Sequence, residues 1–528
     1  MGALTLKTFP FELRGWDIEK LESVDPTDAF GSDTLVYVNK NKIVQVEPNY
    51  DINSENTWLT DKGRQFFDSV FQNQVSENTN WSLIFESLIQ NLYINEYCQL
   101  QQGKENSLTI VFENVSLETL GLLNLLSQLR SFIKVRRLEK TNVNNDFETK
   151  IQLHNSLTRP KLLSSTFCLL ITTNPRFEGY QLNLNLRQRY FKGNFKCALL
   201  GSLLDLTFPV SFLGNNLGIL KSLIEGNHLI CQEIQAAKNP IVVLNSELSK
   251  RSDGKELLKA LDVLKHTNVF NTYWNGVNVL NSSLGETGAN LLSNFKSFTE
   301  QDLRNSNSIY FLNTGTNNLT NFKKLVEMKI LENNGKVKAP LVLEQVTQKT
   351  ADNELYNYIN ANFKAFEHYH YLPASMFYEN EETFFSTDGY LKRTNKLVFK
   401  KETKSGWHIL RKLSKLINED VYSLKTKHNH SISFSSEKLA NLRIYSNFHY
   451  QVTQTLTNIN FYLTDHNKPF YLNLKFKKFK ERQLKLKMSK LKFWLNDFYC
   501  DGKDEYSNNS LVLTNCSKIL RKKQSNFF

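Results

Sequence analysis

The stretch TFCLLITTNPRFEGYQLNLNLRQRYFKGNFKCALLGSLLDLT, residues 166–207, decides the fold of this chain. Phe167 to Ile171 is a continuous apolar run, the pattern of a strand buried on both faces of a parallel sheet. Pro175 suits the first turn of the helix that follows, because its ring fixes φ and no N–H is needed there. A second apolar run, Cys197 to Leu200, ends at Gly201. The spacing predicts a strand–turn–helix–strand unit of an α/β fold.

The turns that follow these two strands form a candidate nucleotide site. Such turns lie at the carboxyl edge of a parallel sheet, where backbone N–H groups can bind phosphate. Asn174 and Pro175 belong to the first turn, and Gly201 belongs to the second. The spacing alone favours a simpler interpretation, in which these residues only build an α/β core.

The rest of the chain continues the α/β pattern and adds small β portions. Four or five strand–helix repeats can be counted between residues 166 and about 345. The polar residues 136–160 are predicted to form a loop, and a helix is expected after Trp407. An Asn39-Lys40-Asn41 turn predicts a hairpin near the start. Strands are predicted at Thr34 to Val38, Lys42 to Val46 and Leu108 to Phe112, near Phe167, Lys196, Ile241, Ile309 and Leu341, and within Phe384 to Val398.

Length and composition limit the class of protein. A chain of 528 residues is too long for one compact core, so two to four subdomains are expected. The mean hydropathy is −0.42, and no apolar run approaches the roughly 18 residues of a membrane span. The sequence therefore predicts no transmembrane segment, and it shows no secretory signal or Arg-rich transit peptide.

The six cysteines are too dispersed to form a metal or cluster motif. No two of them have the spacing of two to four residues with which one loop presents several thiolates. So few cysteines in so long a chain also argue against a disulfide framework and favour a reducing compartment. The cysteines are Cys98, Cys168, Cys197, Cys231, Cys500 and Cys516.

A series of short motifs runs along the chain from residue 2 to about residue 420. Its members are Gly2-Ala3-Leu4-Thr5, Glu22-Ser23-Val24-Asp25, Asp28-Ala29-Phe30-Gly31-Ser32, Trp58, Asp61-Lys62, Arg64-Gln65-Phe66, Asp68, Asn174-Pro175-Arg176-Phe177-Glu178, Ala198-Leu199-Leu200-Gly201, Asp205-Leu206-Thr207, Leu213-Gly214, Ser252-Asp253-Gly254, Trp274, Asn278-Val279-Leu280, Leu372-Pro373, Tyr378-Glu379, Thr383, Gly389, Trp407 and Leu413-Ser414. No single motif is specific. The ordered series closely resembles the C-terminal part of the large iron–sulfur subunit of respiratory complex I, a part that is similar to molybdopterin oxidoreductases.

The resemblance implies a fold and a function. The fold is α/β, with Rossmann-like strand–helix subdomains and small β portions, and is molybdopterin-oxidoreductase-like. Residues 1–60 are expected to complete the cluster domain of a partner chain, residues 61–425 to form the α/β region, and residues 426–528 to form a basic extension. The implied function is that of a non-catalytic structural subunit of the peripheral, matrix arm of complex I. The chain would brace the iron–sulfur clusters that carry electrons from NADH to ubiquinone.

The resemblance also implies partners. In the family, the motif at Gly2 follows the last cysteine of the cluster-bearing portion, and here Met1 stands before it. We therefore expect a split subunit whose N-terminal, cluster-bearing fragment is another chain, with artificial truncation as the alternative. The iron–sulfur clusters and FMN are expected in partner chains, and other peripheral-arm subunits are expected neighbours. Abundant Phe, Lys and Asn with scarce Gly and Pro indicate AT-rich codons, which favours mitochondrial encoding over an AT-rich bacterium.

The residues themselves argue against catalysis. The region around Asp28 offers no thiol for a molybdenum ion, and the residues from Arg176 to Glu178 fill the place where a phosphate needs close approach to the backbone. We expect no catalytic residue, no metal ligand and no bound cofactor, only a relic nucleotide-binding turn at Asn174, Pro175 and Gly201. The pairs His368 with His370 and His428 with His430 lack a nearby third ligand. The alternative function is the catalytic chain of a molybdopterin-dependent oxidoreductase.

A basic tract follows at residues 475–492, with nine Lys or Arg and a single acidic residue, Glu481. Such a tract could bind nucleic acid or an anionic membrane. Aromatic residues are not regularly interleaved with the basic ones, as a base-stacking surface requires. We therefore expect no nucleic acid partner and interpret the tract as an extension in solvent or on an acidic subunit.

The dispersed cysteines lead to a prediction about metal content. We expect neither an iron–sulfur cluster nor molybdenum in this polypeptide, because no set of thiolates is placed to hold either. Elemental analysis and electron paramagnetic resonance of the isolated chain check this. Stoichiometric molybdenum, or a cluster signal from this chain alone, would contradict it.

Overall fold

The computed structural model describes residues 13–49, 58–70, 107–129, 132–138, 156–251, 253–261, 269, 274–281, 283–292, 295–299, 301–302, 306–313, 341–346, 369–399, 403–415, 491 and 510–525. Contacts divide the chain into two compact units, residues 1–411 with 487–528, and residues 412–486. The strands and sites described below lie in the first unit.

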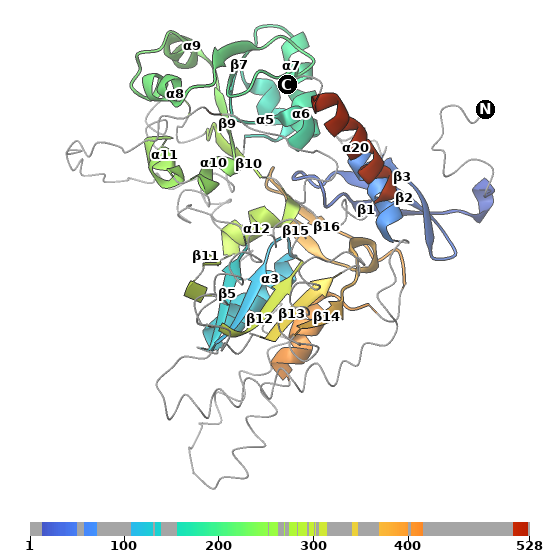
Figure 1. The fold of residues 1–528 in the computed structure, drawn as a ribbon. Helices are drawn as coiled ribbons and strands as arrows, with labels where there is room; N and C mark the ends of the chain where they lie inside the picture. The colour runs from blue at the N-terminus through green and yellow to red at the C-terminus, as the bar shows by residue number, and fades with distance from the viewer. Residues whose placement is uncertain are drawn as a thin grey trace, which may run out of the picture. The chain divides into compact units, whose positions relative to one another are not determined.

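The N-terminal sheet has three antiparallel strands, β1 (Glu19–Val24), β2 (Asp33–Asn39) and β3 (Lys42–Pro48), as Figure 1 shows. Lys40 and Asn41 both have positive φ, which is the backbone that a two-residue hairpin turn requires. The predicted hairpin is therefore confirmed. Helices α1 (Asp61–Gln65) and η3 (Phe66–Val70) follow this sheet.

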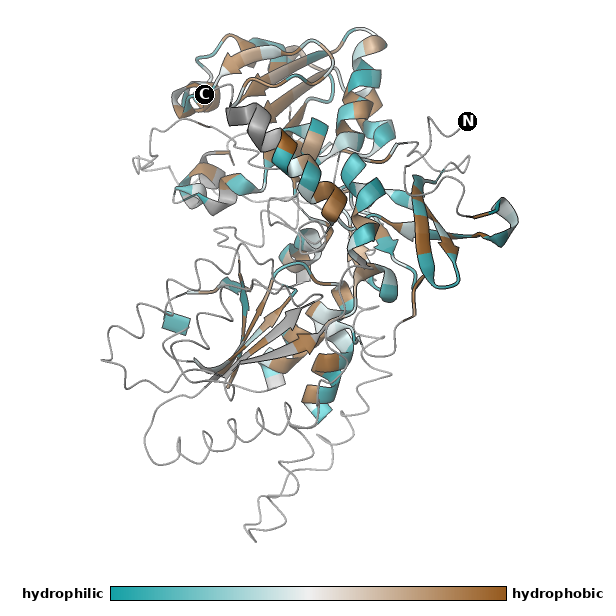
Figure 2. Cartoon of the chain, turned by 45° about the vertical axis from the view of Figure 1, so that its right-hand side comes forward, coloured by the Kyte–Doolittle hydropathy of each residue, from teal (hydrophilic) through white to brown (hydrophobic). Residues whose placement is uncertain are grey.

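A five-stranded parallel sheet contains the stretch at residues 166–207. Its strands are β6 (Phe167–Ile171), β7 (Lys196–Leu200), β8 (Ser211–Gly214), β9 (Ile241–Asn245) and β10 (Val277–Leu280), in the spatial order β10-β9-β6-β7-β8. The order reverses between β6 and β9, as in doubly wound nucleotide-binding folds. Every residue of β6 and β9 is buried, and apolar residues are brown on the strands in Figure 2.

Helices precede and connect the strands of this sheet. They are α5 (Arg159–Ser164), α6 (Pro175–Glu178), α7 (Tyr180–Phe191), α8 (Leu217–Ile224), α9 (Ile230–Ala236), α10 (Glu247–Lys250) and α11 (Gly254–Leu261). Pro175 is the first residue of α6, as predicted from its missing N–H. Leu182 and Leu186 of α7 pack on Leu170 and Leu199 of the strands in one apolar core.

A second parallel sheet has six strands: β4 (Ser107–Phe112), β5 (Ile133–Arg137), β11 (Lys296–Ser297), β12 (Ser306–Leu312), β13 (Leu341–Val346) and β14 (Tyr369–Pro373). Their spatial order is β11-β5-β4-β12-β13-β14, which reverses between β4 and β12. Helices α3 (Leu117–Leu129) and α12 (Leu284–Leu292) accompany it.

The two sheets correct two expectations. The predicted strands near Ile309 and Leu341 exist, but they belong to the six-stranded sheet and do not extend the series that begins at Phe167. The predicted loop at residues 136–160 is wrong at its two ends, because Arg136 and Arg137 pair within β5 and α5 begins at Arg159. Apolar and basic residues alternate in β5, which is the pattern of a strand. This pattern extends the strand to Arg136 and Arg137, although their polarity had indicated a loop.

The C-terminal elements contribute to the apolar core of the N-terminal sheet. A small hairpin, β15 (Thr383–Phe385) with β16 (Leu391–Arg393), and a helix at residues 406–415 confirm two predictions. Helix α20 (Leu511–Ser525) lies against α1 and η3 (Figure 1). Of the basic tract at residues 475–492, only Leu491 is described; the rest lies outside the described residues. Among the described helices, none is long and apolar enough to cross a membrane.

Helix α20 provides a stability prediction. Leu513 is fully buried in the same apolar cluster as Val36 and Phe66, whereas Ile519 on the same helix is 59% exposed. Leu513→Ala should lower the free energy of unfolding by about 2–5 kcal/mol, because it removes buried methyl groups and leaves a cavity. Ile519→Ala should change it by less than about 0.5 kcal/mol. Urea unfolding measures both, and equal effects would show that α20 does not pack as described.

Candidate functional site

The point where the strand order of the five-stranded sheet reverses is filled by a side chain of the protein itself. The backbone N–H of Asn174 donates to Glu178 Oε2 at 2.9 Å. The amide of Asn245, at the end of β9, lies 3.0 Å from both carboxylate oxygens of Glu178. In doubly wound folds this is the crevice where a ligand binds. Here an internal carboxylate accepts the hydrogen bonds that a phosphate would accept.

The remaining groups at this edge are poorly suited to an anion. Thr172 has a φ of 54°, a left-handed conformation that is strained for a β-branched residue. The hydroxyls of Thr172 and Thr173 and the side-chain oxygen of Asn174 are buried and have no partner among the described residues. An amide oxygen repels phosphate. A phosphate site uses several backbone N–H donors, and two hydroxyl groups would supply only part of that number of hydrogen bonds.

The second turn of the predicted site packs against protein. Gly201 has a φ of 142°, and a Cβ atom there would lie 3.2 Å from the Cα of Thr172. The same Cβ atom would lie 3.7 Å from the carbonyl oxygen of Leu491. Leu491 is 1% exposed, and its N–H donates to Asn215 O at 2.6 Å. Glycine is therefore needed here for close packing of the chain on itself.

The six-stranded sheet shows the same closure at its own reversal point. Asn114, just after β4, accepts the N–H of Gly285 with its side chain at 2.9 Å, and its carbonyl accepts the amide of Asn313 at 3.2 Å. Asn313 follows β12, the strand beside β4. A Cβ atom at Gly285 would lie 2.2 Å from Asn114 Oδ1, so no side chain fits. The first turn of α12 thus binds a side chain where an open fold would bind a ligand.

The structure brings the three residues of the predicted relic turn to one sheet edge. Asn174 is 5% exposed, Pro175 starts α6, and Gly201 lies beside Thr172. That this turn is a relic of a nucleotide site remains a prediction. His370 lies in β14, while His368, His428 and His430 lie outside the described residues. Within the described residues, no group of three His, Cys, Asp or Glu side chains is arranged to hold a metal.

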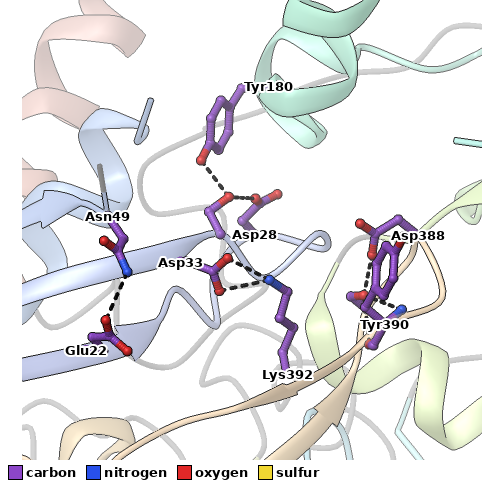
Figure 3. A network of polar contacts seen from close by, with 10 residues as sticks. Glu22, Asp28, Asp33, Asn49, Tyr180, Asp388, Tyr390 and Lys392 are labelled. Carbon is purple, nitrogen blue, oxygen red and sulfur yellow. Dashed lines mark hydrogen bonds and ion pairs between the residues drawn. The ribbon is translucent and has the colours of Figure 1, made fainter. Parts of the chain in front are cut away.

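A buried acidic network lies where β1 turns into β2 (Figure 3). Asp28 Oδ2 lies 2.7 Å from Ser32 Oγ, and the hydroxyl of Tyr180 lies 2.5 Å from the same Ser32 Oγ. Lys392 of β16 lies 2.8 Å from both oxygens of Asp33. Asp388 accepts from Ser386 in the adjacent turn. The network joins three segments that are distant in sequence.

Sequence reasoning missed this network as a site. Asp28 and Ser32 were predicted only as members of a family motif, and Tyr180 and Lys392 had no predicted role. Their partners lie 148 and 359 residues away along the chain, so no spacing rule connects them. The available signal was the acidic composition of a segment flanked by two strands, with Asp25, Asp28 and Asp33 in nine residues.

The comparisons with known proteins match most of the chain. The family model described as Molybdopterin oxidoreductase matches residues 94–416. A second model, NADH-ubiquinone oxidoreductase NDSU1/NuoG-like, 4Fe-4S domain, matches residues 18–68. The first of these covers more than half of the 528 residues.

Three relatives illustrate the similarity. The NADH-ubiquinone oxidoreductase 75 kDa subunit of Reclinomonas americana is 29% identical over 55% of this chain and 44% of its own length. The mitochondrial NADH-ubiquinone oxidoreductase 78 kDa subunit of Candida albicans is 25% identical over 81% of this chain and 57% of its own length. The mitochondrial NADH dehydrogenase (ubiquinone) iron-sulfur protein 1 of Solanum tuberosum is 28% identical over 53% and 38%. The chain thus spans about half the length of the curated relatives it matches.

The residues present do not fit the groups that these names imply. Cysteine thiolates hold 4Fe–4S clusters, and residues 18–68 contain no cysteine. The first cysteine of the chain is Cys98. At the two reversal points, Glu178 accepts the backbone N–H of Asn174 and Asn114 accepts that of Gly285, and backbone N–H groups at such points are donors of the kind that bind phosphate.

The Glu178 contacts lead to a stability prediction. Glu178→Ala should lower the free energy of unfolding by about 1–3 kcal/mol, because it removes the acceptor of the Asn174 backbone N–H and leaves the Asn245 amide only the longer contact with Thr172 O at 3.3 Å. The matched control is Asp205→Ala, which removes an exposed carboxylate paired with Arg176 of the same helix and should change little. Chemical unfolding of both variants provides the measurement. A Glu178→Ala chain as stable as the control variant would show that the carboxylate does not fill the reversal point.

Proposed function

Because this chain belongs to the molybdopterin oxidoreductase family, we propose that it is a non-catalytic structural subunit in the peripheral, matrix-side arm of respiratory complex I. The observation that carries the proposal is the order of the two family matches. A complex I-type 4Fe-4S domain model at residues 18–68 is followed by the molybdopterin oxidoreductase model at residues 94–416. The three relatives reported above, which are 25–29% identical to this chain, carry the names of subunits of NADH-ubiquinone oxidoreductase or NADH dehydrogenase.

The closed reversal points support a structural role. A catalytic member of this fold must open the carboxyl ends of its sheets to a cofactor. In this chain the side chains of Glu178 and Asn114 satisfy the groups at those ends, and Leu491 covers Gly201. The fold then contributes packing surface and rigidity, while the electron transfer of the complex takes place in other chains.

The cysteine-free sheet supports a division of labour with a partner. Residues 18–68 match a cluster domain but hold no thiolate, so the ligands of any cluster beside this sheet have to come from residues outside it. We infer that β1, β2 and β3 brace a cluster-bearing N-terminal portion on a separate chain. Under this proposal the iron–sulfur clusters and FMN belong to partner chains, and other peripheral-arm subunits are neighbours.

The proposed location follows from the relatives. The Candida albicans and Solanum tuberosum relatives are named as mitochondrial, and the composition of this chain favours AT-rich codons such as those of organellar genomes. We infer a mitochondrial protein on the matrix side of the inner membrane, encoded in the mitochondrion.

A second candidate is the catalytic chain of a molybdopterin-dependent oxidoreductase. The family match to residues 94–416 favours it. The absence of cysteine from residues 18–68 and the two closed reversal points argue against it. Molybdenum content distinguishes the two, since only the catalytic chain would retain the metal.

The experiment is affinity purification of the native assembly through a tag on this chain. If the proposal is correct, the tagged chain co-migrates on a native gel with NADH oxidation activity. The associated chains should include one with clustered cysteines, detected by mass spectrometry. The eluate should contain iron and FMN but no stoichiometric molybdenum.

Two controls make the result decisive. A tagged protein of similar size and charge that is unrelated to the complex should not elute with the activity. Depleting this chain should abolish the assembled complex and its activity together. A chain that purifies alone with bound molybdenum would instead support the oxidoreductase candidate.

A further inference from the structure

Four oxygen atoms lie in a line of short contacts between the β1–β2 turn and helix α7. Asp28 Oδ2 is 2.7 Å from Ser32 Oγ, Ser32 Oγ is 2.5 Å from the Tyr180 hydroxyl, and that hydroxyl is 2.6 Å from the carbonyl of Trp58. Asp28 and Tyr180 are labelled in Figure 3, at the two ends of the part drawn there. All three distances lie in the range of O–H···O hydrogen bonds.

Counting protons in this line fixes the state of Asp28. Three hydrogen bonds need three protons, one between each pair of oxygens. The hydroxyls of Ser32 and Tyr180 supply one each, and the carbonyl of Trp58 supplies none. If Asp28 were ionised, one pair of oxygens would face each other without a proton at a distance where they repel.

We propose that Asp28 carries the third proton and that the contact between the β1–β2 turn and α7 is therefore sensitive to pH. In this arrangement Asp28 donates to Ser32, Ser32 donates to Tyr180, and Tyr180 donates to Trp58 O. The proposal concerns the fold and stands apart from the function proposed above. It assigns a proton to Asp28 and a donor to each of the three hydrogen bonds, whereas an ionised Asp28 would leave two of the oxygens in contact without a proton between them.

The charges around Asp28 favour the neutral acid. Burial and the negative charge of Asp25 raise the pKa of Asp28 from 3.8 to about 7, with a smaller contribution from Asp388 of the β15–β16 turn. Asp25 is held as an acceptor by the N–H and hydroxyl of Thr27 at 2.9 and 2.7 Å. Hydrogen bonding with Ser32 and with the Phe30 amide opposes the rise in the pKa of Asp28 only in part.

The other charged groups facing this line act in the same sense or are neutralised. Burial and the charges of Asp28, Asp25 and Asp33 raise the pKa of Tyr180 well above 10, so Tyr180 keeps its proton. Lys392 of β16 is the nearby cation, and it is paired with Asp33 at 2.8 Å. Burial and the two carboxylates together outweigh the hydrogen bonds of Ser32 and Phe30 in setting the pKa of Asp28.

The line of hydrogen bonds lies at a joint between subdomains. Phe30, two residues after Asp28, is buried in the core of the five-stranded sheet with Leu170 and Leu182. Its ring lies so close to Gly179 that a Cβ atom there would be 2.8 Å away. Tyr180 is the next residue and the first of α7. Loss of the proton therefore removes a hydrogen bond beside the contact that anchors the N-terminal sheet to α7.

The sign of the pH dependence follows from the raised pKa. Below about pH 3.8 both folded and unfolded chains hold the proton, and the contribution of Asp28 to stability is fully present. Between 3.8 and about 7 the unfolded chain releases the proton while the folded chain keeps it. The contribution therefore falls as pH rises through this window and is lost above about pH 7.

The test compares the full-length chain with Asp28→Asn, whose amide N–H can donate to Ser32 as the neutral acid does. The urea midpoint of the wild type should fall between about pH 5 and pH 8, and Asp28→Asn should lose much of this slope. At about pH 8 the variant should be at least as stable as the wild type. Burial also raises the pKa of Glu382 to about 8, so Glu382 titrates in the same range. Its effect on the urea midpoint is common to both chains, so the difference between their midpoints reports on Asp28.

The matched control is Asp33→Asn, the same chemical change in the same turn. It breaks the pair with Lys392, so it should lower the midpoint at every pH and keep the wild-type slope. Infrared spectroscopy is the second measurement. A protonated-carboxyl C=O band at about pH 6 should be present in the wild type and Asp33→Asn and weakened in Asp28→Asn. Unchanged slope with an unchanged band in Asp28→Asn would overturn the proposal, as would lower stability of Asp28→Asn than the wild type at about pH 8.

Discussion

The arrangement of this chain depends on how the polar groups at the carboxyl ends of its two parallel sheets are satisfied. Each sheet reverses its strand order once, between β6 and β9 and between β4 and β12. Such a reversal separates the connecting loops and leaves N–H donors pointing into a crevice. A protein that binds a ligand there satisfies these donors with the ligand. In this chain Glu178 accepts the backbone N–H of Asn174 at the first reversal, and Asn114 accepts that of Gly285 at the second.

Closure of the crevices has a chemical cost that the structure shows. Thr172 keeps a left-handed backbone, and the hydroxyls of Thr172 and Thr173 are buried without partners among the described residues. Strain and unpaired polar groups lower stability by amounts of about 1–3 kcal/mol each. The edge thus has the polarity of a binding site together with the packing of a core.

Sequence reasoning succeeded where short-range rules decide the structure. The apolar run Phe167–Ile171, the position of Pro175 and the turn at Lys40 and Asn41 each follow from local sterics and burial, and all are as predicted. It failed where long-range pairing decides. The strand at Ile309 pairs with β4, which lies some 200 residues earlier, and the strand at Leu341 pairs with the strand at Ile309. No local pattern states to which sheet a buried parallel strand belongs.

The candidate site shows the same limit more strongly. The sequence indicated that Asn174, Pro175 and Gly201 follow two neighbouring strands, as they do, while their origin as a nucleotide-binding turn stays a prediction. It also predicted that residues 176–178 would crowd a phosphate. It could not show that Glu178 turns back to Asn174, or that Leu491 covers Gly201 from nearly 300 residues away. The network around Asp28 was missed because buried carboxylates are unusual in any pattern of burial. It depends on burial and on the positions of Asp25 and Tyr180 in three dimensions.

The long-range completion of the N-terminal sheet has a consequence for the synthesis of the protein. Strands β1, β2 and β3 leave the ribosome early, but their apolar core also contains Phe377, Tyr378 and Leu513. At common elongation rates, roughly 20 to 90 seconds separate the emergence of β3 from that of Leu513. Throughout that interval, the nascent sheet exposes valine and isoleucine side chains and unpaired strand edges, which are prone to aggregate. A chaperone or an early partner chain that covered these strands before translation finished would remove that exposure.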